Sequence, residues 1–140
     1  MPVTKRDYPA SMLNCGDTFL TGDGVEDNFH LWIVITPANE GEVVTACVVT
    51  AHKRSERLVV LNQGDHPFIQ HESVIAYLHS KIRTVPDIEE LLNKGIAKKR
   101  DPVSLELLKR IQAGLVESDF TPNGVRAYYR EVMADPEFRR

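Results

Sequence analysis

Three of the five histidines flank segments of the chain that have the composition of β-strands. His30 directly precedes an apolar segment, and His66 and His71 lie in the polar stretch before another. Histidine is the side chain best suited to move protons near neutral pH. Because strand ends can converge on one rim of a small barrel, these three residues are candidates for acid–base chemistry. A packing or surface role is the alternative for each of them, and it is our interpretation of His52 and His79.

Hydroxyl and cationic side chains accompany these histidines near the ends of the same segments. Cleavage of RNA through its 2′-hydroxyl needs a base, an acid and a donor that stabilises the charged phosphate, and it needs no metal. A solvated turn is the alternative interpretation of the two cations. We predict as catalytic His30, Thr50, His66, His71 and Ser73, and as substrate-binding Lys53 and Arg54.

We expect no metal and no cofactor. His66 and His71 are separated by Pro67 and do not have the spacing of a helical metal pair. No cysteine or carboxylate pattern completes a zinc site. Cys15 and Cys47 are far apart, and Cys47 lies in an apolar segment where it is expected to be a small buried hydrophobe. A disulfide between them stays open, although a cytosolic setting argues against it.

Apolar segments rich in β-branched residues, separated by Gly, Pro, Asn and Asp, predict the strands that position these residues. Their near-continuous hydrophobicity indicates that both faces are covered, as in a small closed barrel or a sheet beneath helices. A polar loop is expected at 21–28, and residues 1–11 are expected to be a loosely ordered lead-in. The predicted strands are Thr18–Leu20, Leu31–Thr36, Val43–Thr50, Arg57–Leu61 and Val74–Leu78, and the last of them leads to the segment 79–85.

The pattern changes to capped helical periodicity after the strands, and it predicts helices near 87–94, 102–116 and 122–133. Asp101-Pro102 and Thr121-Pro122 have the form of a cap followed by proline at the first helical position. The basic stretch 96–100 is expected to be a linker. The apolar residues of the last two helices lie on one side, so we expect these helices to pack on the strands or on a second copy of them.

The composition is that of an ordinary globular protein. A chain of 140 residues supports one core, and 42% hydrophobic with 26% charged residues is typical. The net charge of −3 does not indicate a nucleic-acid binder, because such domains are usually basic. No apolar run reaches the ~20 residues that span a bilayer, and the N-terminus lacks the apolar core of a signal peptide. A cytoplasmic protein is expected.

Short motifs in a defined order resemble the PemK/MazF toxin family over roughly residues 12–95. Gly16-Asp17-Thr18-Phe19 is similar to the family's Gly-Asp opening, and Leu31–Ile35 and Val43–Thr50 resemble its next two strands. His71–Ile75 and Lys81–Val85 resemble its Asp-Ser-Val segment and its Ile-Arg-Thr-Ile end. The resemblance implies an α+β chain that is mainly β. Residues 1–95 would form an SH3-like barrel with one helix. Residues 96–140 have no counterpart in the common short members of the family, and we expect them to form a helical extension packed on the same core.

The resemblance also implies an activity: a metal-independent endoribonuclease that cleaves single-stranded RNA, is often a homodimer and is neutralised by an antitoxin partner. The family's catalytic pair is an arginine before the first core strand and a threonine at the end of the next. Thr50 matches the threonine, but His30 occupies the arginine position. Either the activity is lost or the acid–base work moves to histidine. The alternative function is a non-catalytic SH3-like module that binds a protein or nucleic acid, which the acidic balance favours.

Overall fold

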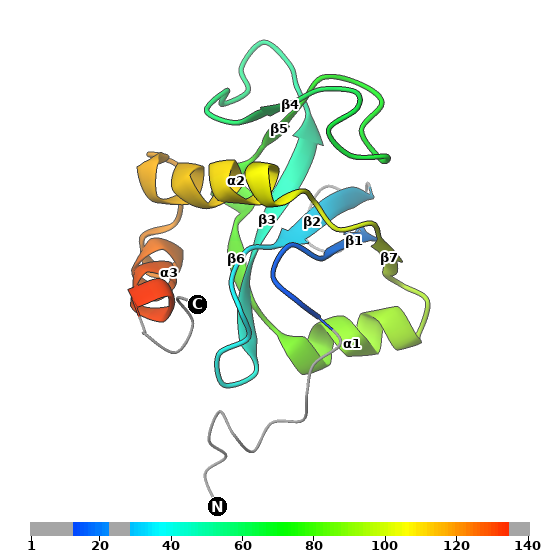
Figure 1. Ribbon diagram of the computed structural model, residues 1–140, viewed down its shortest axis with the longest axis vertical. Coiled ribbons are helices and arrows are strands. Elements are labelled where there is room, and N and C mark those ends of the chain that lie inside the picture. Colours follow the sequence, from blue (N-terminus) through cyan, green and yellow to red (C-terminus); the bar gives the residue numbers. More distant parts are fainter. Residues whose placement is uncertain (1–12, 23–28, 135–140) are drawn as a thin grey trace, which may run out of the picture.

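The computed structural model describes residues 13–22 and 29–134 and shows a sheet with helices against it (Figure 1). The expectations for residues 1–11 and for most of the loop at 21–28 lie outside the described residues. The prediction of mixed α and β structure is confirmed, and helices occupy about as much of the described chain as strands. The strands are β1 (Thr18–Thr21), β2 (His30–Val34), β3 (Glu42–Thr50), β4 (Val60–Leu61), β5 (Ser73–Ile75), β6 (Lys81–Thr84) and β7 (Lys98–Arg100), and the helices are α1 (Val85–Asn93), α2 (Leu105–Glu117), α3 (Asn123–Ala134) and the 3-10 helix η2 (Tyr77–His79).

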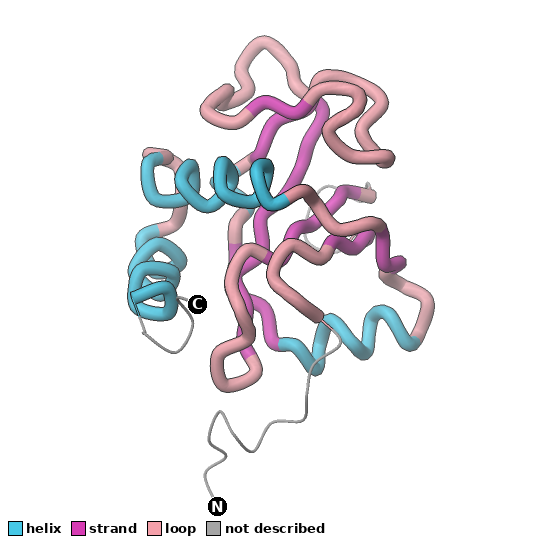
Figure 2. Tube along the Cα trace, viewed as in Figure 1, coloured by secondary structure: helices cyan, strands magenta, loops and turns pink. Residues whose placement is uncertain are grey.

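The strand β3 is the centre of an antiparallel sheet. It pairs with β2 along one edge, and its other edge is shared by β6 near its start and β5 near its end. The strand order from one end of the sheet to the other is β4-β5-β3-β2-β1-β7, with β6 beside β3. The closure of this sheet into an SH3-like barrel stays a prediction. Figure 2 shows the long loops around β4 and β5 at one end of the molecule, away from α1.

Both faces of the sheet are covered, as the near-continuous apolar segments predicted. Alternate residues of a strand point to opposite faces, so neighbouring β2 residues enter different cores. Leu31 and Ile33 join a cluster that includes α2 and α3, whereas Trp32 and Val34 join a cluster that includes residues of α1. Figure 1 shows α2 crossing in front of β3 with α3 beside it and α1 near β1 and β7.

Two predicted strands are shorter than expected. The segment expected as a strand from Val74 to Leu78 pairs only as far as Ile75 and then turns into η2. The turn buries the Tyr77 ring, and its hydroxyl donates to the carbonyl of Ile111 in α2, 2.8 Å away. A tertiary contact therefore overrides the local strand preference. The strand expected at 57–61 is reduced to β4, the two residues that pair with β5.

Two further differences lie at the junction with the C-terminal helices. The basic stretch expected as a linker contains β7, which pairs with β1 at the edge of the sheet. Helix α2 begins at Leu105 rather than at 102, because the Ser104 side chain caps it by accepting from the Leu107 N–H at 3.1 Å. The carbonyl of Asp101 serves tertiary contacts instead, since it accepts from the Thr18 hydroxyl at 2.8 Å. Within the described ranges, no helix has the length and apolar character required to traverse a bilayer.

Candidate functional site

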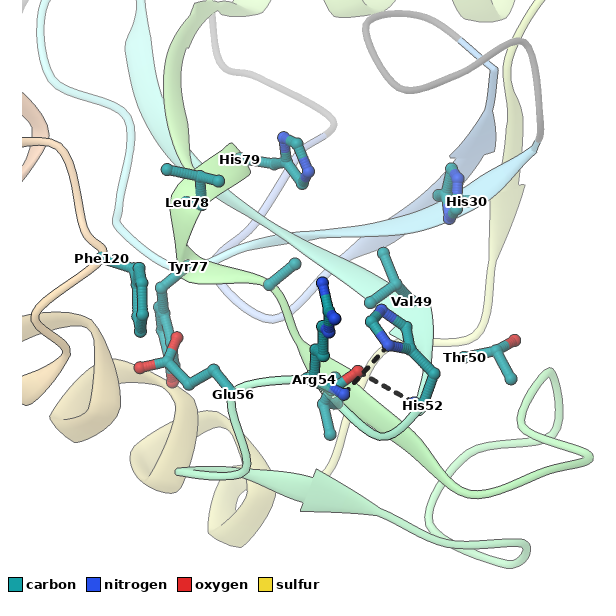
Figure 3. Close-up of a pocket in the computed structure, with 13 residues that line it drawn as sticks. His30, Val49, Thr50, His52, Arg54, Glu56, Tyr77, Leu78, His79 and Phe120 are labelled. Atoms are coloured by element: carbon teal, nitrogen blue, oxygen red, sulfur yellow. Dashed lines mark hydrogen bonds between the residues drawn. The ribbon is translucent and has the colours of Figure 1, made fainter.

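A cavity of about 440 Å³ lies where β2, the end of β3 and η2 meet the turn between α2 and α3 (Figure 3). Histidines enter its lining from three different elements: His30 opens β2, His52 follows β3, and His79 ends η2. Thr50 and Arg54 also belong to the lining. Proton-transfer groups, a hydroxyl and a guanidinium therefore share one concave surface.

The environment of His30 determines which of its ring nitrogens can act as a base. Its Nδ1 lies 3.2 Å from the carbonyl oxygen of Val48 on the neighbouring strand β3. A carbonyl oxygen only accepts, so Nδ1 carries the proton and the neutral ring has its lone pair on Nε2. That Nε2 is shielded from solvent and has no hydrogen-bond partner among the described residues. A buried polar atom left in this way requires an explanation, and a catalytic role is one.

The opposite tautomer is stabilised at His52. Its Nδ1 accepts from the backbone N–H of Arg54 at 3.2 Å, so the neutral ring carries its proton on Nε2. The backbone N–H of His52 donates to the Ser55 hydroxyl at 2.9 Å, which closes the turn (Figure 3). The two neutral imidazoles therefore differ at Nε2, which carries a lone pair in His30 and a proton in His52.

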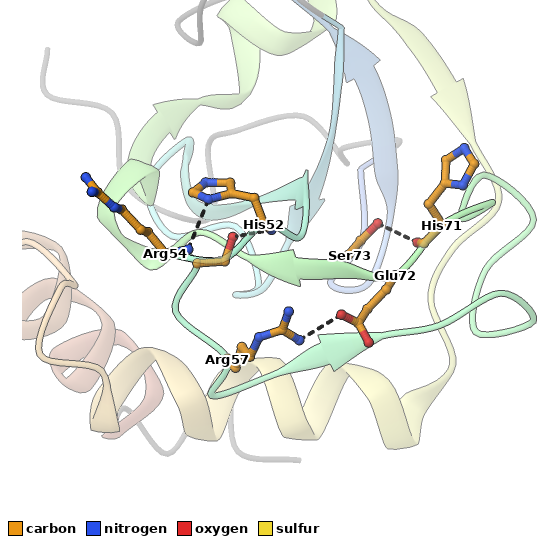
Figure 4. Close-up of polar contacts among 7 residues, drawn as sticks. His52, Arg54, Arg57, His71, Glu72 and Ser73 are labelled. Carbon is orange, nitrogen blue, oxygen red and sulfur yellow. Dashed lines mark hydrogen bonds and ion pairs between the residues drawn. The ribbon is translucent and has the colours of Figure 1, made fainter.

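A second cavity of about 420 Å³ adjoins the first, because His30, Val49 and Thr50 line both. His71 and Ser73 are in the lining of the second cavity, so four of the five predicted catalytic residues surround these two cavities. The Ser73 hydroxyl donates to the His71 carbonyl at 2.9 Å and is buried (Figure 4). The hydroxyl of Ser73 is therefore engaged by its own segment, whereas the His71 ring is exposed.

His66 is placed differently from the other predicted residues. Only 4% of it is exposed, its Nε2 donates to the Asp101 carbonyl at 2.5 Å, and its Nδ1 accepts from the Phe68 N–H at 3.0 Å. Nδ1 thus holds the backbone of its own loop, and Nε2 ties that loop to the backbone at Asp101. His66 lines a third cavity, of about 570 Å³, together with Lys99 and Arg100, and it is absent from the lining of the first two.

The cations and the remaining histidines also depart from the sequence-based assignment. Of the two predicted substrate-binding residues, Arg54 lines the first cavity and Lys53 does not. His52 and His79, interpreted as surface or packing residues, both line it. The available signal for His52 was its place two residues before Arg54, directly after a strand. His79 gave no comparable signal, because it follows the predicted strand Val74–Leu78 and was interpreted as a packing or surface residue.

The carboxylates of Glu72 and Glu56 lie near the cavities and are both engaged by neighbouring side chains. Beside the second cavity, Arg57 and Glu72 form an exposed ion pair with an N–O distance of 2.7 Å (Figure 4). Glu56 lines the first cavity, and its Oε2 accepts from the Ser118 hydroxyl at 2.5 Å. Over the described ranges, no group of three or more His, Cys, Asp or Glu side chains is arranged to hold a metal ion.

Comparison with known proteins gives a likeness at the level of structure. No family model matches the sequence, and no curated protein matches it. Among solved structures, the chain is similar to the MazE-MazF complex (Form-II) from Deinococcus radiodurans. The sequence identity is 12% and the TM-score 0.49, over 75% of this chain and 92% of that one. A likeness of this degree assigns neither family nor function.

Proposed function

We propose that the protein is a toxin-like, metal-independent endoribonuclease that cleaves single-stranded RNA. The observation that carries the proposal is the cavity that His30, Thr50 and Arg54 line together, with the Nε2 of His30 buried and without a partner among the described residues. These groups match what cleavage through the ribose 2′-hydroxyl requires. No resident cofactor is needed for this chemistry.

In the proposed reaction, His30 Nε2 removes the proton of a 2′-hydroxyl, whose oxygen attacks the adjacent phosphorus atom. The bond from phosphorus to the 5′-oxygen of the next nucleotide breaks, and that oxygen takes a proton. The products are a 2′,3′-cyclic phosphate and a free 5′-hydroxyl. Arg54 and the Thr50 hydroxyl stabilise the charge that develops on the phosphate oxygens. The proton comes from an imidazolium, and the exposed His71 and His79, one in each cavity, are the candidates.

The first prediction tests the base. We expect the His30→Asn variant to cleave RNA ~10²–10⁴-fold more slowly than the wild type, because Asn keeps a donor for the Val48 carbonyl but lacks the basic nitrogen. The measurement is a time course with labelled single-stranded RNA in EDTA, with cyclic-phosphate ends detected among the products.

Two controls accompany this measurement. Lys94→Ala alters the exposed residue that follows α1 and pairs only with Glu90 among the described ion pairs, so it should cleave at the wild-type rate. Single-stranded DNA of the same sequence should stay intact, since it lacks the 2′-hydroxyl. Equal cleavage by wild type and His30→Asn would remove His30 from the mechanism. Binding of RNA without any cleavage would favour the alternative of a non-catalytic binding module.

The toxin–antitoxin setting belongs to the same proposal and is supported by the sequence resemblance in Gly16–Phe19, His71–Ile75 and Lys81–Val85. It includes an SH3-like barrel, an antitoxin partner, a homodimeric assembly and a cytoplasmic location. Co-expression with the product of a neighbouring small reading frame tests the partner. Rescue of growth by that product, with formation of a stable complex, is the expected outcome.

A further inference from the structure

The exposed phenylalanines of the described chain all lie at the three cavities of the site. Phe120 is 55% exposed at the first cavity, Phe29 is 65% exposed at the second, and Phe68 is 37% exposed and lines the second and the third. His30 and Thr50 line both the first and the second cavity, and Phe68 lines both the second and the third, so each cavity adjoins the next. The adjoining cavities form a path with an exposed aromatic ring in the lining of each part.

Hydrogen bonds hold the turn that carries Phe120. The Ser118 hydroxyl accepts from the Phe120 N–H at 3.0 Å and donates to Glu56 at 2.5 Å, which ties the turn to the loop after β3. The Thr121 hydroxyl donates to the Leu115 carbonyl at 2.8 Å. Figure 3 shows Phe120 beside Glu56 at one end of the lining, with Thr50 at the other. An exposed aromatic ring on a turn fixed in this way is a preorganised contact surface.

The loop that carries Phe68 is fixed by the buried His66. The Nδ1 of His66 accepts from the Phe68 N–H, and its carbonyl accepts from the Ile69 N–H at 2.9 Å. Its Nε2 donates to the Asp101 carbonyl, which also anchors the loop beside β7. This accounts for a buried histidine that the proposed reaction does not use: it positions an exposed ring.

Cations lie along the same path. Arg54 lines the first cavity, and Lys99 and Arg100 line the third, against the two carboxylates of Glu56 and Asp101. Lys99 also pairs with Asp17 at an N–O distance of 3.4 Å, so the three cations of the path face as many nearby carboxylates. Exposed rings interleaved with cations are the features that bind unpaired nucleic acid, because each base has a face that can stack and each nucleotide carries a phosphate. Paired bases cannot reach these rings, because they are already stacked in a helix.

We propose that the three cavities form one track for a single strand of RNA, with Phe120, Phe29 and Phe68 as stacking platforms and Arg54 and Arg100 as phosphate contacts. The choice of RNA rests on the proposed function. The scissile bond lies at His30 and Thr50, between the platform of Phe120 and the platform of Phe68. The turn after α2 thus contributes directly to substrate binding.

The second prediction tests the track by binding alone. The probe is fluorescently labelled single-stranded RNA with 2′-O-methyl riboses, which cannot be cleaved through the 2′-oxygen. Anisotropy should show an affinity that rises with length until the strand spans all three platforms and then levels off. Phe120→Leu and Phe68→Leu should each weaken binding by roughly 5–100-fold, because leucine keeps the apolar contact but not the stacking. Arg54→Ala should lower the slope of log K against log salt by about 0.7.

Leu105→Ala is the matched control, since Leu105 is 65% exposed on α2 and lines none of the three cavities. It should bind the probe as the wild type does. Thermal melting of each variant verifies that the fold is intact. Wild-type affinity in both Phe→Leu variants, or the absence of binding by the wild type, would overturn the track.

Cleavage of unmodified RNA by the same preparations separates this inference from the proposed function. If the wild type binds the probe through the platforms but cuts no RNA, the track stands and the nuclease fails. If it cuts RNA and both Phe→Leu variants bind and cut equally well, the nuclease stands and the track is wrong.

Discussion

The same residue type serves opposite purposes in this chain according to its hydrogen bonds. His66 uses both ring nitrogens to hold backbone groups, and it is buried. His30 uses one nitrogen to contact β3 and leaves the other without a partner among the described residues. Only the second arrangement leaves a lone pair for proton transfer. Hydrogen bonding, and not the presence of histidine, therefore separates the positioning residue from the candidate base.

The third prediction concerns the buried thiol of Cys47. Burial raises its pKa to about 12, against the lowering effect of Arg83 and Lys81. The thiol ionises more readily in the unfolded chain, from its ordinary value of 9.0, so unfolding above pH 9 releases a proton that the folded state retains. The free energy of unfolding should consequently fall as pH rises from about 9 to 12.

Urea denaturation at a series of pH values measures this effect. One titrating thiol contributes up to about 1.4 kcal/mol per pH unit. Cys47→Ala should be less stable at neutral pH because it leaves a void, but it should lose stability less steeply above pH 9. Burial also raises the pKa of Tyr129, to about 12, so part of the alkaline loss should persist in the variant. Identical slopes in both proteins would contradict the assignment.

At the scale of elements, the contact between η2 and α2 explains why one helix residue must be glycine. A Cβ on Gly114 would lie 2.1 Å from the Tyr77 hydroxyl oxygen and 3.0 Å from a Val59 methyl carbon. The absence of a side chain lets α2 approach η2 closely enough for Tyr77 to donate to the Ile111 carbonyl. Phe120, in the turn that follows α2, lines the first cavity together with Tyr77.

The fourth prediction follows from this close contact. Gly114→Ala should lower the free energy of unfolding by about 1–3 kcal/mol, because the gain in helix propensity is smaller than the cost of overpacking. Gly124→Ala in α3 is the matched control, since its Cβ would meet nothing within 4 Å, and it should be neutral or stabilising by up to ~1 kcal/mol. Adding Tyr77→Phe to Gly114→Ala should restore part of the loss. Chemical denaturation of the four proteins checks each value, and a stabilised Gly114→Ala protein would refute the argument.

At the scale of the whole molecule, the C-terminal helices complete one of the two cores. Residues of α2 and α3 share a buried cluster with residues of β2, β3 and η2. The second cluster, on the other face of the sheet, contains Phe19 and Trp32 together with residues of α1. The helices therefore act on both stability and the site, through the apolar face they cover and through the turn that carries Phe120.

The fifth prediction is that residues 1–100 do not fold as a stable unit on their own. Removal of the remainder would expose the sheet face that now contacts buried α2 residues such as Ile111 and Leu115. Exposed apolar surface costs roughly 25 cal/mol per Å². The truncated chain should aggregate or lack a cooperative thermal transition in calorimetry. A soluble truncated protein with the melting temperature of the full chain would show that the helices are dispensable.

The sequence by itself determined the type and order of most elements. Local chemistry decides the secondary structure of these elements, because each segment has one way to bury its apolar side chains. Examples are the apolar segment Val43–Thr50 and the capped periodic segment 122–133. The sequence also placed the candidate residues His30 and Thr50 at strand ends, and these two do line the same cavity.

Tertiary structure alone decided what depends on contacts between distant residues. Tyr77 lies in η2 and not in the expected strand, because its hydroxyl donates to a carbonyl 34 residues away in α2. The buried His66 holds its loop in place because it donates to the Asp101 carbonyl. His52 lines the cavity because the turn after β3 folds back. Phe120 reached the same cavity through helices whose packing no local pattern specifies. Spacing in the chain reports which groups are present, whereas the folded geometry determines which of them meet.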